Sequence, residues 1–93
     1  MPAIRAETRV AQRRDLLSTQ VGDELVLMSV EQGEYYGFDP VAAGVWARLA
    51  EPTTVGSLVE TLAAAYEGDP ATIAADVQRL LEMLAEKGLL ELS

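Results

Sequence analysis

The feature that most constrains the fold of this 93-residue chain is a change in the spacing of its apolar residues near residue 39. Before that point, short apolar runs are separated by Gly22-Asp23 and by Gln32-Gly33, and each pair offers a glycine for a tight turn. From residue 40 onward, apolar residues recur with the three- and four-residue spacing of a helix face. Strands followed by helices predict an α+β fold.

The first part of the chain predicts three short strands joined by tight turns. The expected strands cover residues 16–21, 25–30 and 35–38. Two successive tight turns produce an antiparallel meander, in which the second strand is central and the third lies at an edge.

The second part predicts three helices with clear start and stop signals. The expected starts are Asp39-Pro40, Thr54 and Asp69-Pro70, and the expected ends are Pro52, Gly68 and Lys87-Gly88. The tail, residues 89–92, forms either a short strand or a cover for the core. A three-stranded meander followed by a three-helix bundle is similar to a winged helix-turn-helix.

The charge is unevenly distributed along the chain. The formal net charge is −8, yet residues 1–14 contain four arginines against Glu7 alone. We therefore expect residues 1–14 to form a basic, flexible N-terminal arm and residues 15–93 to form the folded domain. A presequence or a docking arm is the alternative interpretation of the arginines.

The composition argues against catalysis and against nucleic-acid binding. The chain has no cysteine and no histidine, so thiol chemistry and the commonest general base and metal ligand are missing. The acidic body disfavours contact with phosphates. No apolar run is long enough for a signal peptide or a membrane span. We expect a cytoplasmic binding module that is not an enzyme and needs no cofactor, metal, nucleic acid or membrane.

The third expected strand is the strongest candidate for a binding surface. Its sequence is Glu34-Tyr35-Tyr36-Gly37-Phe38, which has no lysine or proline to protect an edge. Such an edge is either covered by the protein itself or open to a partner strand. A peptide added there would form about four ladder hydrogen bonds, each worth roughly 0.5–1.5 kcal/mol net. Ordinary core aromatics beside a covered edge are the simpler interpretation.

Two other classes of function stay open at this point. One is a winged-helix DNA-binding regulator, although the exposed positions of the second and third helices are rich in Glu and Asp. The other is a structural domain whose edge strand is closed by a homodimer.

A set of ordered motifs resembles the PqqD-like family. The run from Gly33 to Asp39, followed by Ala42-Ala43-Gly44-Val45-Trp46 and Leu49, carries most of the likeness. Further matching segments are Asp23 to Met28, Thr54-Val55, Leu58-Val59, Leu62, Tyr66, Asp76-Val77, Leu80-Leu81, Leu84 and Gly88-Leu89-Leu90. The departures are Phe38 for the family's leucine and Asp39 for its asparagine, and both fit a strand and a helix cap.

The resemblance implies a recognition element for ribosomally synthesised and modified peptides. Such a chaperone binds the leader region of a precursor peptide and presents it to a modifying enzyme, either a radical SAM enzyme of pyrroloquinoline quinone biosynthesis or a leader peptidase of lasso peptide biosynthesis. In the family the leader adds as a β-strand to the third strand, beside the third helix.

Carried onto this chain, the resemblance implies two walls of a peptide groove. The predicted peptide-binding residues are Glu34, Tyr35, Tyr36, Gly37, Phe38, Asp76, Val77, Arg79 and Leu80. The other shoulder of the third helix, with Leu81 and Ala85, is the alternative wall. Arg79 can pair with an acidic leader residue or with Asp76 or Glu82 on its own helix.

Overall fold

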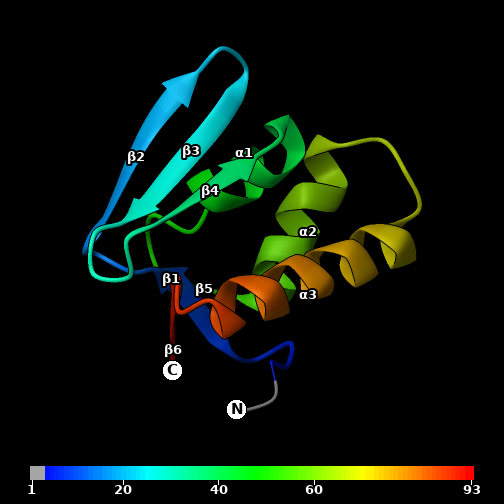
Figure 1. Ribbon diagram of the computed structural model, residues 1–93. Helices are drawn as coiled ribbons and strands as arrows, with labels where there is room; N and C mark the ends of the chain where they lie inside the picture. The colour runs from blue at the N-terminus through cyan, green and yellow to red at the C-terminus, as the bar shows by residue number, and fades with distance from the viewer. Residues whose placement is uncertain (1–3) are drawn as a thin grey trace.

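The computed structural model describes residues 4–93, which form two three-stranded sheets and three helices (Figure 1). The elements in chain order are β1 (Arg9–Gln12), β2 (Leu16–Val21), β3 (Glu24–Ser29), β4 (Glu34–Phe38), α1 (Pro40–Ala47), β5 (Thr53–Thr54), α2 (Val55–Ala65), α3 (Pro70–Glu86) and β6 (Leu90–Leu92). The α+β class predicted from the sequence is confirmed.

The predicted meander is present as the sheet β2-β3-β4, with β3 in the centre. Gly22 and Gly33 have φ values of 64° and 68°, so both turns use the left-handed conformation that glycine adopts without strain. The register places Leu27 of β3 opposite Ser18 of β2 and opposite Tyr36 of β4. The meander and its strand order are therefore as predicted.

The three predicted helices are also present, although α1 ends at Ala47, before the expected stop at Pro52. Asp39 caps α1, because its carboxylate accepts a hydrogen bond from the Ala42 N–H at 2.8 Å. Thr54 caps α2 in the same way, through the Ser57 N–H at 3.2 Å. Asp69 stands at the cap position of α3, but its carboxylate accepts from the Thr72 hydroxyl and makes no cap hydrogen bond to the backbone.

A second sheet, in the order β5-β1-β6, was not predicted. Its central strand β1 comes from the expected arm, and Val10 of β1 lies opposite both Thr53 and Leu92 and is fully buried. The expectation of a flexible arm is therefore wrong for residues 4–14, and the folded domain does not start at residue 15. A four-residue strand with one buried side chain has no detectable period, and its partners lie far away in the sequence. Residues 1–3 of the expected arm lie outside the described residues.

Of the two alternatives for the C-terminal tail, the structure shows the short strand, because β6 pairs with β1.

The basic N-terminal segment contacts the acidic body directly. Arg13 lies 3.1 Å from Asp15 and 3.8 Å from Glu31, and it donates a hydrogen bond to the Gly88 carbonyl at 3.3 Å. Arg13 is thus part of the fold, and Arg9 lies within β1.

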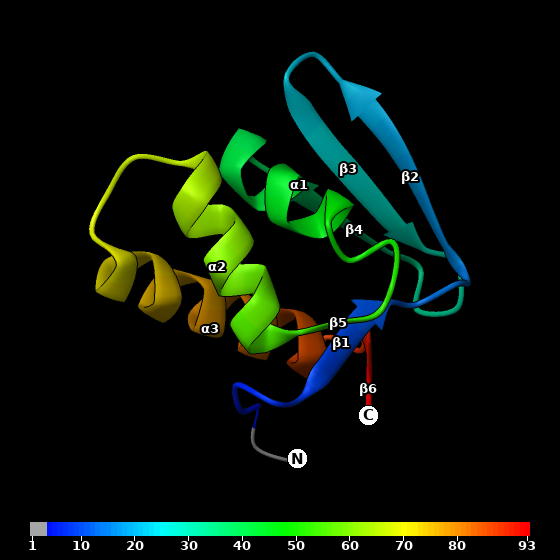
Figure 2. The ribbon, with the colours of Figure 1, turned by 180° about the vertical axis from the view of Figure 1, so that it is seen from behind.

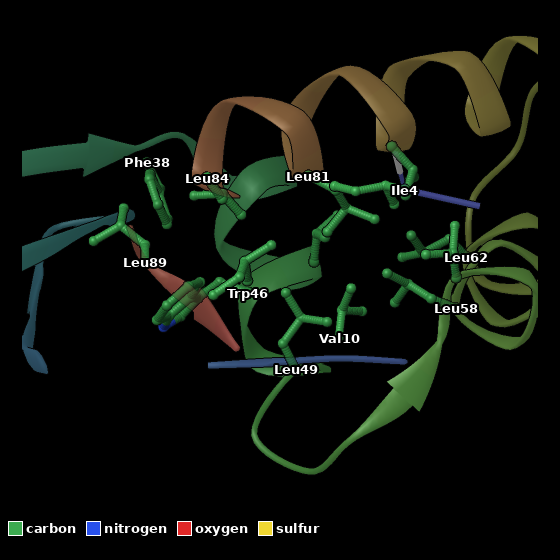
Figure 3. Close-up of a cluster of buried hydrophobic side chains, with 14 of the residues drawn as sticks. Ile4, Val10, Phe38, Trp46, Leu49, Leu58, Leu62, Leu81, Leu84 and Leu89 are labelled. Carbon is green, nitrogen blue, oxygen red and sulfur yellow. The ribbon is translucent and has the colours of Figure 1, made fainter. Parts of the chain in front are cut away.

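The hydrophobic core lies between the helices and the two sheets (Figure 3). Trp46 of α1 meets Phe38 of β4 edge to face, with ring centroids 5.8 Å apart. This contact anchors the end of β4 to α1, and α1 covers the inner face of β3 and β4. Within residues 4–93, no helix is long and apolar enough to cross a membrane.

Candidate functional site

The strand β4 lies at an edge of its sheet, as predicted. Within the described part of the chain, β4 pairs with β3 on one side and with no strand on the other. Figures 1 and 2 both show β4 as the strand of this sheet nearest to α3, with β2 farthest away. The open edge therefore lies next to the helix that the resemblance implied as the second wall.

The side chains of β4 divide between the two faces of the sheet, because successive residues of a strand alternate. Phe38 is buried and Tyr36 half-buried on the inner face, which α1 covers. Tyr35 is 72% exposed and lies on the outer face together with Gly37. The structure thus places Tyr35 on the face turned away from α1, whereas Tyr36 contacts Lys87 at the C-terminal cap of α3.

Tyr36 joins the start of β4 to the end of α3. Its hydroxyl donates to the Glu34 carboxylate at 2.8 Å and lies 3.0 Å from the amide oxygen of Gln32. The Lys87 ammonium lies 5.8 Å from the centre of its ring, a cation–π contact. Gln32 in turn donates to the Lys87 carbonyl at 3.2 Å.

The hydroxyl of Tyr36 has a pKa raised above its ordinary value of about 10, chiefly by the hydrogen bond to Glu34 and then by desolvation and the charge of that carboxylate. The folded state therefore holds this proton more tightly than the unfolded state. The associated stability is present below pH ~10 and is lost as the pH rises through the folded-state pKa. We expect Glu34→Gln to lower this pKa, measured by tyrosinate absorbance with Tyr36→Phe as the reference. An unchanged titration in Glu34→Gln would contradict the assignment.

A single helical stripe runs along α3 and continues to Lys87 at its C-cap. Asp76, Leu80, Met83 and Lys87 are spaced at i, i+4, i+7 and i+11. The first three, together with Arg79, line a shallow hollow of about 360 Å³. Met83 and Lys87 were missed from the sequence, although their spacing from Leu80 is the signal that identifies them.

A second hollow, of about 210 Å³, continues the first toward the start of α1. It is lined by Asp39, Val41, Ala42, Val45, Asp76, Val77 and Leu80. The two hollows share Asp76 and Leu80, so they form one mostly apolar surface that begins where β4 ends. We call this surface the α3 groove.

The choice between the two shoulders of α3 follows from burial. Leu81 is fully buried and points into the core (Figure 3), so it is not exposed toward any groove. Val77 is also in the core and reaches the α3 groove only at its margin. The accessible shoulder is the one with Asp76, Arg79 and Leu80.

The charged pair on this shoulder is exposed. The Arg79 guanidinium lies 3.7 Å from the Asp76 carboxylate, and the two side chains are 78% and 65% exposed. Exposed pairs of this kind contribute little to stability, so Arg79 can change partner at small cost.

Comparisons with solved structures identify three similar chains. TbiB1 in complex with the TbiA(beta) leader peptide has 32% sequence identity and a TM-score of 0.78, over 87% of this chain and 94% of that one. A lasso peptide synthetase B1 complexed with the leader peptide has 26% identity and a TM-score of 0.75, over 92% and 99% of the two chains.

The third chain is the PqqD truncation of Methylobacterium extorquens PqqCD, described as a functional and stand-alone recognition element for ribosomally synthesised and post-translationally modified peptides. It has 27% identity and a TM-score of 0.73, over 89% of this chain and 88% of that one. No curated protein sequence matches this chain significantly. The family model of coenzyme PQQ synthesis protein D (PqqD) matches residues 24–90, which is most of the chain. The chain therefore belongs to the PqqD family.

Proposed function

We propose that this protein is a non-catalytic peptide chaperone that binds the leader region of a ribosomally synthesised precursor peptide and presents it to a modifying enzyme. The observation that carries the proposal is the open edge of β4 beside the α3 groove. Two structures with similar chains contain leader peptides, and the similar PqqD chain is a recognition element.

Binding is proposed to combine a β-ladder with side-chain contacts. Alternate residues of β4 point their N–H and C=O groups away from β3, and an extended peptide pairs with those groups. Leu80 and Met83 then receive the peptide side chains that face α3. The backbone contacts supply sequence-independent affinity, whereas the α3 groove selects for apolar side chains.

The partners in this proposal are a leader peptide and one modifying enzyme, either a radical SAM enzyme or a leader peptidase. A cytoplasmic location is part of the proposal, because precursor peptides are made by ribosomes. The proposal assigns no role to nucleic acid, a cofactor or a catalytic residue.

The test is a binding titration with fluorescent synthetic leader peptides of candidate precursors from the genome that encodes this chain. We expect Leu80→Ser combined with Met83→Ser to lower the affinity ~10-fold, because two apolar side chains lose their contact with the peptide. The matched control is Ala75→Ser with Glu82→Ser, which alters exposed positions of α3 outside the stripe. If the wild-type chain binds a scrambled leader equally well, the proposed function is wrong.

A further inference from the structure

The outer face of the sheet β2-β3-β4, opposite to α1, carries a continuous row of apolar side chains. Leu17, Met28 and Tyr35 lie opposite one another across the three strands. Leu17 is 55% and Tyr35 72% exposed, and Val21 farther along β2 is 58% exposed. These large side chains are turned away from the core, and no element of the described residues covers them.

This face is unusual for an antiparallel sheet with one side in water, where polar and charged residues normally occupy the outer positions. The strand residues on the outer face are Leu17, Thr19, Val21, Glu24, Val26, Met28, Tyr35 and Gly37. Only Glu24 among them is charged, although 24% of the chain is Asp, Glu, Lys or Arg. Contiguous exposed apolar surface of this kind marks an interaction site.

Acidic residues frame the apolar face. Residues 15–38 contain Asp15, Asp23, Glu24, Glu31 and Glu34 and no lysine or arginine. Arg13 pairs with Asp15 and Glu31 at one end of the sheet. At the other end, within residues 4–93, no basic side chain forms an ion pair with Asp23 or Glu24. A second copy of the chain would bring the same acidic frame and a further net charge of −8.

We propose that the outer face of β2-β3-β4 docks a partner protein whose contact surface is apolar and bordered by lysine or arginine. The identification of this partner as the modifying enzyme rests on the proposed function. Tyr35 and Gly37 belong both to this face and to β4. A peptide strand added to β4 extends the same face, so the partner meets the chaperone and the bound peptide side by side.

The test uses Leu17→Lys combined with Val21→Lys, two changes on β2 that leave the β4 edge untouched. The added lysines remove apolar contact and repel a basic border, and the one at position 21 lies directly opposite Glu24, which favours it. The matched control is Ala64→Lys with Ala65→Lys, which makes the same change of charge on exposed positions of α2. The probes are a purified candidate modifying enzyme from the same genome and the labelled leader peptide, titrated separately.

We expect the β2 variant to lose at least ~10-fold in affinity for the enzyme and to keep its leader affinity within about twofold, because the two sites are separate. The α2 control should change neither affinity. A second variant, Leu17→Thr with Val21→Thr, keeps the strand propensity and should lose less affinity for the enzyme. It replaces the lysine variant in the test if that variant does not fold.

Two results would overturn the proposal. One is that the wild-type chain does not bind the enzyme, or that the β2 variants bind it as tightly as the wild type does. The other is a wild-type dimer in sedimentation that the β2 variants dissociate, which assigns the face to a second copy. A third outcome separates the two proposals. If the wild-type chain does not bind the leader but binds the enzyme, and the β2 variants weaken that enzyme binding, the proposed function is wrong and the docking face is supported.

Discussion

Replacing Tyr36 by proline is expected to lower the affinity for the leader peptide at least ~100-fold, about 3 kcal/mol at tenfold per 1.4 kcal/mol. Proline removes a backbone N–H and clashes with the extended ladder, so two or three hydrogen bonds of roughly 1 kcal/mol each are lost with the alignment of the edge. The Tyr36 contacts to Glu34 and Lys87 disappear as well. The measurement is fluorescence anisotropy of the labelled leader, with circular dichroism to confirm folding.

The matched control is Ser18→Pro, because Ser18 faces the same central residue, Leu27, from the opposite edge of the sheet. It perturbs β2 to a similar extent but lies away from α3. We expect it to leave leader affinity within about threefold, since substitutions at separate sites act independently. A folded Tyr36→Pro variant with wild-type affinity would rule out strand addition to β4.

Replacing Val10 by aspartate is expected to destabilise the protein by roughly 3–5 kcal/mol, a large part of the total stability of a small domain. Val10 is fully buried in the middle of the sheet β5-β1-β6, so the new carboxylate has no charged partner there. The measurement is urea unfolding followed by the fluorescence of Trp46, the single tryptophan.

The control is Arg9→Asp, a change at the neighbouring exposed position of the same strand. We expect it to cost less than ~1 kcal/mol, since exposed charges contribute little. If the Val10→Asp variant is as stable as the Arg9→Asp variant, β1 does not contribute to the stability of the fold. The N-terminal segment would then be a flexible arm, as the sequence predicts.

Much of the candidate site was predictable because its determinants are local. Gly22 and Gly33 place the two turns, and three strands joined by tight turns leave the third one at an edge. The stripe on α3 is only partly evident from the sequence. The resemblance points to Leu80 and not to Met83, although the helical period places Met83 on the same stripe at i+3.

The sequence does not predict to which side each residue of the candidate site points. Tyr35 and Tyr36 are adjacent and chemically alike, yet one lies on the outer face and the other contacts Lys87. Leu80 and Leu81 are equally apolar, yet only Leu81 is fully buried. Relative burial depends on what packs against each face, and those neighbours come from distant parts of the chain.

The sequence by itself determined the α+β class, the meander, the three helices and the aromatic edge strand, because turns, caps and apolar periods act over a few residues. Only the tertiary structure decided that residues 9–12 form a central strand, that the accessible shoulder of α3 carries Asp76 and Leu80, and that an apolar face lies behind β4. The pairing of β1 with β5 and β6 joins segments more than forty residues apart. A four-residue strand acquires its stability from those partners, so its own sequence does not reveal it.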